Sequence, residues 1–316
     1  MPALLLLSAC VVRVNTETTL TGSPTVTVVE PIDSLRARIN RRIAVVPGAE
    51  VGLWYKDLAT PETLSVAPDV SFHAASTMKL PVMIELFRRS DARTISLSQT
   101  LQIENKFASI VDGSPYTLNA GDDSDSLLYK QIGSAVTLRE LNQRMITRSS
   151  NFATNLLIQQ LDAKTITATA RALDARNIRV LRGVEDSKAF AQGLNNTTTA
   201  RDLGVLLLAI ENGTAASAAS CAAMKDVLLH QEFSTEIPAG LPPGTPVAHK
   251  TGWITATLHD AAIVYPLSGR RPYILVVLTR GIPKDTVARA LIADISREVY
   301  RFALGRSAAR PGSTSK

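Results

Sequence analysis

Hydrophobic and polar positions alternate near the two ends of the chain and recur at helical spacing through its middle. Residues 32–46 carry apolar side chains every three or four positions, which predicts an amphipathic helix. Residues 51–58 and 63–66 predict two strands, joined by a turn around Pro61. The front of the chain therefore contributes one helix and a pair of strands.

The middle of the chain is predicted to be helical, apart from a loop-rich segment over residues 91–136. Threonines with capping patterns mark two of the helix starts, and Asn212-Gly213 ends one of the helices. The predicted helices of this part begin near Thr77, at Thr137, after Ser149, at Thr165, at Thr199 and at Ala215.

The closing part of the chain returns to a strand pattern after a link rich in proline and glycine. Three strands are predicted over residues 247–250, 261–265 and 273–279, and a last helix over residues 285–302. Two strands at the front and three at the back indicate one antiparallel sheet that is assembled from both chain ends.

We therefore predict an α/β fold of the α+β kind, with a five-stranded antiparallel sheet flanked by helices, a second all-helical lobe, and the active site in the cleft between them. The predicted boundaries are a signal and tether over 1–30, one catalytic domain over 31–306 with its sheet lobe over 31–74 and 236–306 and its helical lobe over 75–235, and a disordered tail over 307–316.

The helix that begins near Thr77 is predicted to be buried, because residues 80–87 are apolar on nearly every face. Pro81 is tolerated only in a first helical turn, so this helix should start close to Thr77, with Ser76 at its N-terminal tip. Ser76 and Lys79 are three residues apart and would lie on one face. A serine hydroxyl needs a neighbouring base, and a lysine can be that base when burial or nearby positive charge lowers its pKa.

Two further motifs follow in the chain. Ser149-x-Asn151 stands at the start of a predicted helix, and Lys250-Thr251-Gly252 stands on the first of the closing strands. Each motif alone has a simpler interpretation. Ser76 could cap a helix beside a solvated Lys79, Ser149 could cap the helix after it, Asn151 could form an Asx turn, and Lys250-Thr251 could face solvent.

The three motifs in this order resemble the serine β-lactamases and penicillin-binding proteins, with class A β-lactamases as the nearest group. The resemblance covers roughly residues 32–302 and implies a β-lactamase/transpeptidase-like fold. It implies that Ser76 attacks a strained or activated amide carbonyl and becomes acylated, and that Lys79 takes its proton or holds the base that does. It also implies that Ser149 relays a proton to the departing nitrogen.

The same resemblance assigns residues that bind the substrate. Lys250 and Thr251 would attract a substrate carboxylate, and Asn151 would orient a side-chain amide and contact Lys79. Backbone N–H groups of Ser76 and Trp253 would form the oxyanion hole. Gly252 would let the bound acyl group lie against the strand edge.

A class A enzyme also needs a carboxylate that activates water to hydrolyse the acyl-enzyme. Glu185 lies at the spacing from Ser149 that fits the family, with Asp186 as the reserve candidate. The local sequence departs from the family pattern at two positions. Ala189 stands where the water-holding Asn is expected, and Asn196 stands where an acidic partner of the loop arginine is expected. Glu185 could instead be an ordinary surface carboxylate.

Composition narrows the other possibilities. The chain is mildly basic, with a formal charge of +6, but its Lys and Arg are scattered without interleaved aromatics, so we expect no nucleic-acid partner. The four histidines show no metal-ligand spacing, and we expect neither a metal nor a cofactor. Residues 121–126 are acidic but lack the ligand spacing of a calcium loop, so we expect a solvated acidic loop.

The first residues carry a leucine run followed by Leu7-Ser8-Ala9-Cys10, which resembles the lipobox of bacterial lipoproteins. The run is short and no Lys or Arg precedes it, and a start codon placed too far downstream would explain both departures. We expect an exported, periplasmic or envelope-anchored bacterial protein that is lipidated at Cys10, against the alternative of a frayed apolar end. Cys221 would then have no disulfide partner.

Three functions compete at this stage. The first is a serine β-lactamase that hydrolyses β-lactam amides through a Ser76 acyl-enzyme and releases it with water activated by Glu185. The second is a penicillin-binding DD-peptidase, or a related serine hydrolase or esterase, that acts on a peptidoglycan-like substrate and releases β-lactams slowly. The third is a non-catalytic envelope lipoprotein that keeps the fold as a binding surface. In each case we expect a monomer.

Overall fold

The structure is a computed structural model that describes residues 30–307. The predicted leader, Cys10, the tether and the C-terminal tail lie outside the described residues. Within residues 30–307 no helix combines the length and the apolar character that crossing a bilayer would require. The division into a sheet lobe and a helical lobe at fixed residue numbers stays a prediction.

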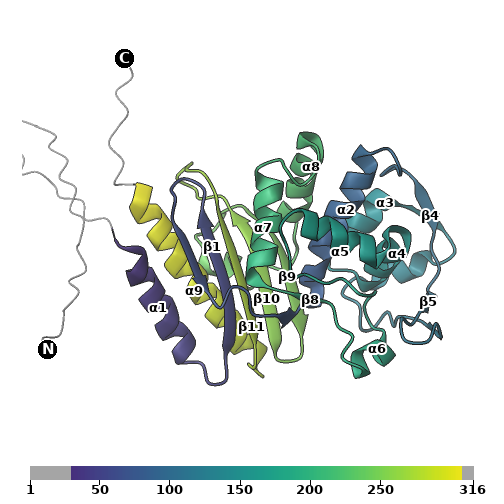
Figure 1. Cartoon of the computed structure of the whole chain (residues 1–316), viewed down its shortest axis with the longest axis horizontal. Coiled ribbons are helices and arrows are strands. Elements are labelled where there is room, and N and C mark those ends of the chain that lie inside the picture. The colour runs from purple at the N-terminus through teal and green to yellow at the C-terminus, as the bar shows by residue number, and fades with distance from the viewer. Residues whose placement is uncertain (1–29, 308–316) are drawn as a thin grey trace, which may run out of the picture.

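A five-stranded antiparallel sheet forms the centre of the fold, in the order β2-β1-β11-β10-β9 (Figure 1). Its strands are β1 (Glu50–Asp57), β2 (Thr63–Val66), β9 (Val247–Ile254), β10 (Thr257–Val264) and β11 (Tyr273–Arg280). The front and back of the chain meet where β1 pairs with β11, from Glu50 opposite Arg280 to Asp57 opposite Tyr273. The prediction of one antiparallel sheet built from both chain ends is confirmed.

The closing strands are longer than predicted, because their alternation is hidden. The difference is largest in β9 and β10, where six and seven of the eight residues are buried, so both faces of these strands are covered by protein. A strand that is buried on both faces reads as a continuous apolar run and loses the period-two signal that marks its ends.

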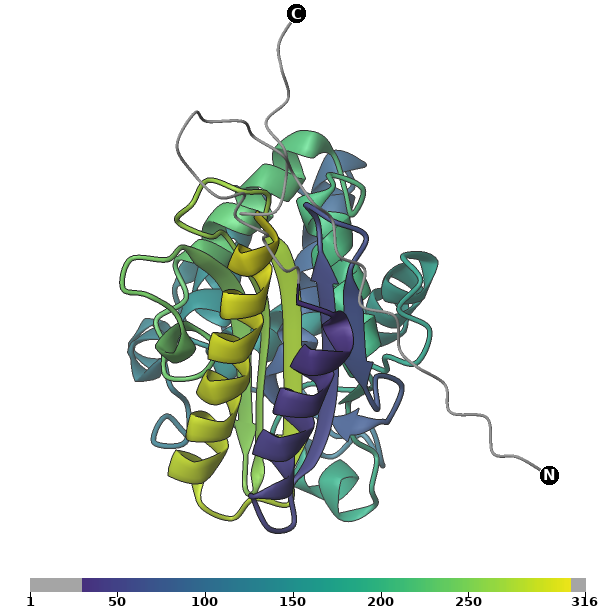
Figure 2. The same ribbon diagram turned by 90° about the vertical axis from the view of Figure 1, so that its left-hand side faces the viewer.

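Two helices cover one face of the sheet. Figure 2 shows α1 (Ile32–Ala44) beside α9 (Asp285–Ser307), so the first and last helices of the chain are neighbours. Leu35 and Ile39 of α1 pack with Ile292 and Ile295 of α9 and with the apolar side chains of that face of the sheet. The predicted helices over 32–46 and 285–302 are therefore both present, within a few residues of their expected ends.

The remaining helices lie on the other side of the sheet, and α7 and α8 pack directly against it (Figure 1). The helices of this part are α2 (Lys79–Asp91), α3 (Leu138–Thr147), α4 (Asn151–Leu161), α5 (Ala163–Ala172), α7 (Ala200–Glu211) and α8 (Ala218–Leu229). Their apolar faces and this face of the sheet share one continuous core. Thr137 and Thr199 cap α3 and α7 through the backbone N–H groups of Glu140 and Asp202, as their sequence patterns predict.

Several short elements connect these helices. They are β3 (Phe72–His73), β4 (Thr100–Gln102), β5 (Phe107–Ala108), β6 (Pro115–Tyr116), β7 (Ala135–Thr137), β8 (Thr197–Thr198), the short helix α6 (Ser187–Ala191), and the 3₁₀ turns η1 (Ala75–Met78), η2 (Ser126–Gln131) and η3 (Pro238–Gly240). The pairing of β3 with β8 has a consequence for the site, because it brings the segment before Ser76 beside the end of the loop that carries Glu185.

The prediction that an α-helix begins close to Thr77 is wrong by two residues. Residues Ala75–Met78 form a 3₁₀ turn, and the α-helix α2 starts at Lys79. Ser76 therefore sits in a tighter turn just before the helix, where 3₁₀ geometry is common. Pro81 does lie in the first turn of α2, and α2 is buried from Lys79 to Phe87, as its apolar sequence predicts.

The expectation of a solvated acidic loop over residues 121–126 holds for Asp122 but is wrong for the other two aspartates of the segment. Asp123 and Asp125 are buried, at 8% and 3% exposure. Buried carboxylates need hydrogen-bond or cationic partners, and these two receive them from α3, from η2 and from the start of α4.

Candidate active site

Residues from three distant parts of the sequence meet at one cleft. Ser76 comes from η1, Asn151 from the first position of α4, Ser149 from the turn just before that helix, and Lys250 from β9. A cavity of about 700 Å³ is lined by Ser76, Ser149 and Asn151 together with Thr251 and other residues. That volume lies in the range typical of small-molecule sites. The remaining lining residues used below are Asp122, Asp123, Glu185, Gly252, Trp253 and Ile254.

The hydroxyl of Ser149 lies between two lysine amines. Lys250 Nζ donates a hydrogen bond to Ser149 Oγ at 3.0 Å, and Lys79 Nζ donates to the same oxygen at 3.2 Å. Both lysines are fully buried, so Lys250 does not face solvent as the simpler interpretation of its motif would require. Ser149 does not cap α4 either, because the capping side chain is that of Ser150.

Burial changes the protonation of both amines. Desolvation lowers the pKa of Lys79 to about 7, although the negative charges of Asp123 and Glu185 act in the opposite direction. Desolvation first, and repulsion from Lys79 second, hold the pKa of Lys250 well below its ordinary value. A lysine with a pKa near neutrality has a substantial neutral fraction and can accept a proton from a hydroxyl.

The hydrogen bonds of Lys79 differ from one expectation. Within residues 30–307 its amine donates to the carbonyl oxygen and hydroxyl of Ser149 and, at 2.9 Å, to Asn151 Oδ1, and none of its hydrogen bonds goes to Ser76. The prediction that Asn151 contacts Lys79 is confirmed.

Glu185 lines the same cleft. Its carboxylate accepts a hydrogen bond from Asn151 Nδ2 at 2.7 Å, so Asn151 connects Lys79 to Glu185. Desolvation raises the pKa of Glu185, and the Asn151 hydrogen bond opposes that rise. The residue keeps contact with solvent through the open cleft, and it therefore has access both to water and to the region in front of Ser76. It is not an isolated surface carboxylate.

The reserve candidate, Asp186, has a different task. Its carboxylate accepts hydrogen bonds from Ser109 Oγ, Ile110 N and Ala189 N at 2.9, 3.0 and 3.1 Å. Burial alone would raise the pKa of Asp186, but these hydrogen bonds outweigh it and the pKa is lowered. Asp186 thus caps α6 and fastens the loop to the segment around Ser109.

Where the family pattern has an ion pair to the loop arginine, the loop around Glu185 is held by side-chain amides. Asn196 Oδ1 accepts a hydrogen bond from the backbone N–H of Leu181 at 2.8 Å, and its Nδ2 donates to the carbonyl of Arg182. The Arg182 guanidinium donates to the carbonyl of Leu194 and to Asn195 Oδ1. Replacement of the expected acidic residue by Asn196 therefore leaves the loop tied through its backbone.

Asn155 is a site residue that the sequence reasoning missed. It lies one helical turn after Asn151, and its side chain accepts from Val184 N at 2.6 Å and donates to Val184 O at 3.0 Å. It therefore holds the residue directly before Glu185. The sequence does contain an indication of this role, because two asparagines four residues apart on a mostly apolar helix share one face.

Gly252 is needed for a close approach of two backbones. A Cβ atom at this position would lie 3.0 Å from Ser76 N and 3.1 Å from Thr77 N. The expectation that Gly252 lets a bound acyl group lie against the strand edge stays a prediction, and the structure gives the glycine a second reason, because the backbone of η1 lies against it. This contact places β9 directly beside the nucleophile candidate and brings Trp253, the next residue, to the mouth of the cleft.

A second cavity, of about 410 Å³, adjoins the first beneath the Glu185 loop. Ser76, Asn151, Glu185, Trp253 and Ile254 line both cavities. Trp253 and Phe190 are exposed at its mouth, with 56% and 59% of their surface accessible. Large exposed aromatic side chains beside a cavity are suited to contact an apolar substituent. Phe190 was not singled out from the sequence.

No group of three or more His, Cys, Asp or Glu in residues 30–307 is arranged to hold a metal ion. Cys221 is buried and unpaired among the described residues. The cleft brings together the hydroxyls of Ser76 and Ser149, two buried lysine amines, the amide of Asn151 and the carboxylate of Glu185. This is the site of a serine hydrolase, in which one hydroxyl attacks and buried bases manage its proton.

Comparison with known proteins agrees with this class. The model of the family described as "Beta-lactamase enzyme family" matches residues 34–303, and the chain therefore belongs to the β-lactamase enzyme family. It is 29% identical to β-lactamase AST-1 of Nocardia asteroides and 28% identical to β-lactamase Toho-2 of Escherichia coli. The alignments cover 80% and 81% of this chain and 78% and 84% of those proteins.

A solved structure shares the fold. A mutant of PBP-A, determined as an acyl-enzyme complex with penicillin G, has a TM-score of 0.72 and 27% sequence identity to this chain. The match covers 86% of this chain and 97% of that one. The predicted α/β fold of the β-lactamase and penicillin-binding-protein type is thus confirmed.

Proposed function

We propose that this protein is a serine β-lactamase that hydrolyses the β-lactam amide through an acyl-enzyme on Ser76. The observation that carries this proposal is the Ser149 hydroxyl held between the buried amines of Lys79 and Lys250, in the cleft that Ser76 and Glu185 also line. Family membership supports the same reaction.

The first half of the reaction forms the acyl-enzyme. Ser76 Oγ attacks the lactam carbonyl and gives its proton to the base system of Lys79 and Asn151-bound Glu185. The carbon–nitrogen bond of the lactam breaks, and Ser149 passes a proton to the departing nitrogen. Ser76 Oγ is then the ester oxygen of the acyl-enzyme, and the lactam ring is open. The N–H groups of Ser76 and Trp253 would hold the carbonyl oxygen during the attack.

The second half releases the product. Glu185 takes a proton from a water molecule, which attacks the ester carbonyl, and the bond to Ser76 Oγ breaks as the serine regains a proton. Glu185 suits this task because its carboxylate faces the cleft and is oriented by Asn151. A raised pKa makes it a stronger base at neutral pH than an ordinary glutamate.

Steady-state turnover of a chromogenic cephalosporin tests the proposal. The wild type is expected to turn over continuously, and Glu185→Gln is expected to stop after one equivalent, with the acyl group trapped. The matched control is Glu232→Gln, an exposed carboxylate outside the cleft, which should turn over like the wild type. A wild type that stops after one equivalent would contradict the proposal.

One observation favours a second candidate, a penicillin-binding DD-peptidase or related serine hydrolase. Ala189 is buried and has no side-chain amide that could hold the hydrolytic water. The side chain that hydrogen-bonds Glu185 is instead that of Asn151. The likeness to PBP-A, a mutant of which was determined as an acyl-enzyme complex with penicillin G, points the same way. Faster cleavage of a peptide ending in D-Ala-D-Ala than of the cephalosporin would select this function.

We also propose export and attachment to the cell envelope through a lipid on Cys10. This rests on the residue pattern Leu7-Ser8-Ala9-Cys10. Labelling with an alkyne fatty acid in a bacterial host should mark the wild type and leave Cys10→Ser unmarked. Equal recovery of both proteins from the cytosol would contradict this proposal.

A further inference from the structure

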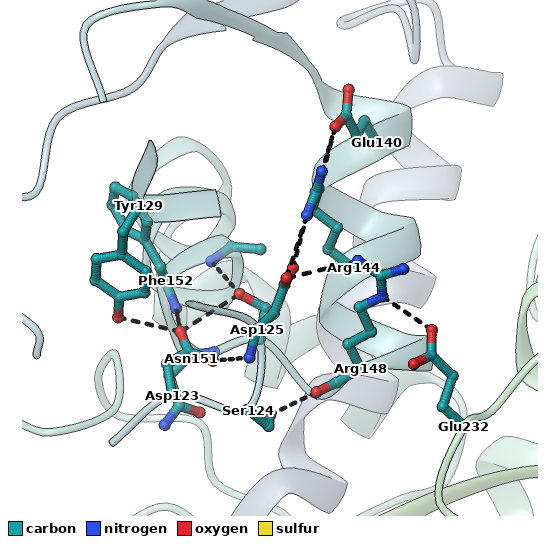
Figure 3. Close-up of polar contacts among 12 residues, drawn as sticks. Asp123, Ser124, Asp125, Tyr129, Glu140, Arg144, Arg148, Asn151, Phe152 and Glu232 are labelled. Atoms are coloured by element: carbon teal, nitrogen blue, oxygen red, sulfur yellow. Dashed lines mark hydrogen bonds and ion pairs between the residues drawn. The ribbon is translucent and has the colours of Figure 1, made fainter. Parts of the chain in front are cut away.

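The buried carboxylates of the acidic loop lie beside the start of α4, the helix that begins at Asn151, two residues after Ser149 (Figure 3). Asp123 accepts hydrogen bonds from the backbone N–H groups of Asn151 and Phe152, at 3.0 and 2.8 Å. These are the first two residues of α4, whose N–H groups have no partner within the helix. The Ser150 hydroxyl adds a longer contact of 3.4 Å.

Asp123 is itself fixed from other elements. Tyr129 in η2 donates its hydroxyl to Asp123 at 3.1 Å, and the backbone N–H of Asp125 donates at 3.0 Å. Asp125 in turn accepts two hydrogen bonds from Arg144 of α3, and Arg144 also binds Glu140 (Figure 3). The carboxylate that caps α4 is therefore anchored through a chain of partners that ends on a neighbouring helix.

This arrangement matters for the site because the backbone of Ser149, the residue before the N-cap Ser150, is strained. Ser149 has a φ of +57°, a region that side chains other than glycine seldom occupy. Its hydroxyl must nevertheless meet both Lys79 and Lys250. A strained residue keeps one orientation only when the chain on either side is held, and Asp123 holds the side that leads into α4.

We propose that Asp123 is a positioning residue for the acylation step. It fixes the first turn of α4 so that Ser149 and Asn151 both meet the Lys79 amine, and its negative charge acts on the base system of the cleft. The inference rests on the proposed acyl-enzyme chemistry. It gives the acidic loop a part in the reaction that its sequence alone did not reveal.

The electrostatic part has a definite direction. The negative charge of Asp123 raises the pKa of Lys79 and also raises the pKa of Glu185. Removal of that charge should lower both pKa values, which moves the acid limb of the rate profile to lower pH. The charged and titratable groups that face Lys79, Glu185 or Asp123 are Asp122, Tyr116, Tyr129 and Lys250.

The test is the pH dependence of benzylpenicillin acylation, measured by intact mass, for the wild type and three variants. Asp123→Asn keeps the size but removes the charge and one of the acceptor oxygens. Asp123→Glu keeps the charge but lengthens the side chain. Glu232→Gln is the matched control, because it removes an exposed carboxylate that pairs only with Arg148 among the described residues.

Asp123→Asn should lower the acylation rate at pH 7 by about tenfold or more, as expected for a lost charge-assisted hydrogen bond, and should move the acid limb to lower pH. Asp123→Glu should slow acylation with the acid limb unmoved, and Glu232→Gln should match the wild type. Far-UV circular dichroism checks that each variant is folded, and Asp123→Glu still tests the inference if Asp123→Asn does not fold.

A slower Asp123→Asn with an unmoved acid limb would show a purely structural cap and overturn the inference, as would a wild-type rate. A folded Asp123→Glu with a wild-type rate, or with a displaced acid limb, would overturn it too. Failure of the wild type to be acylated would instead refute the proposed function, so the two failures are distinguishable.

Discussion

Lys79 and Lys250, which are far apart in the sequence, donate hydrogen bonds to the same oxygen atom of Ser149 at 3.2 and 3.0 Å. One amine comes from the start of α2 and the other from β9. Two buried amines around one hydroxyl disfavour a proton on each other, which is why the charge of Lys79 helps to lower the pKa of Lys250. The two amines are therefore suited to exchange protons with the hydroxyl between them.

Ser149→Ala tests whether this hydroxyl relays the proton. The methyl group leaves both amines without a shared partner and removes the path to the departing nitrogen. We expect the acylation rate to fall by about 10²-fold to 10⁴-fold, the usual contribution of general acid–base catalysis. Stopped-flow measurement with a chromogenic cephalosporin checks this, and Ser268→Ala, in the exposed loop between β10 and β11, serves as the control. A Ser149→Ala rate within threefold of wild type would exclude the relay.

Gly252→Ala tests the close approach between β9 and η1. The new Cβ would lie 3.0 Å from Ser76 N, so the backbone that carries the nucleophile must shift. Overpacking of this kind costs about 1–3 kcal/mol, and we expect lower stability and a much lower acylation rate. Gly305→Ala is the control, since its Cβ would meet no atom within 4 Å and it lies in α9. Equal activity of both variants would show that the contact between β9 and η1 can accommodate a side chain at position 252, which would contradict this prediction.

The depressed pKa of Lys79 predicts a pH dependence of stability. Its folded pKa is about 7 and its ordinary value is 10.5, so between these pH values the unfolded chain binds the proton more strongly. The free energy of unfolding should therefore rise with pH between about 7 and 10.5. Below that window the amine is protonated in both states, and Lys79 adds nothing to the pH dependence. Lys79→Met should remove this part of the rise, which appears as a flatter profile of melting temperature against pH than that of the wild type.

The same substitution also makes a prediction about the reaction rate. Lys79→Met should remove acylation while the protein stays folded at neutral pH, because an apolar side chain suits the buried position. Identical slopes of melting temperature against pH in the two proteins would mean that Lys79 is protonated in the fold across the whole window, and the account of its base character would then be wrong.

Asn155→Ala tests the anchoring of the Glu185 loop. Loss of both hydrogen bonds to Val184 should release the backbone next to Glu185 and cost about 1–3 kcal/mol of stability. We expect deacylation to slow more than acylation, so that acyl-enzyme accumulates during turnover. Intact-mass sampling in steady state measures the accumulation, with Gln159→Ala on the exposed side of α4 as the control. Equal slowing of the two steps would argue for a general disturbance of the cleft.

The sequence predicted the sheet and the three motifs because their signals are local. Alternating or continuous apolar runs mark strands, and Pro81 can stand only in a first turn, so α2 could be placed to within two residues. Ser76, Ser149 and Lys250 could be brought together only through the family resemblance, since no local pattern states that α4 and β9 are neighbours.

The acidic loop shows what the sequence could not supply. Three aspartates within a polar segment look solvated, because burial of a carboxylate depends on partners that are distant in the chain, here Arg144 and the N–H groups of Asn151 and Phe152. The 3₁₀ turn at Ser76 was likewise hidden, because it differs from the first turn of an α-helix by hydrogen bonds rather than by residue type.

Intact-mass kinetics with benzylpenicillin test the central claim most directly. The account predicts an adduct of one penicillin mass on the peptide that contains Ser76, which forms and then disappears in the wild type, persists in Glu185→Gln and is absent in Ser76→Ala. A wild type that never carries the adduct, or an adduct that forms on another residue, would contradict it.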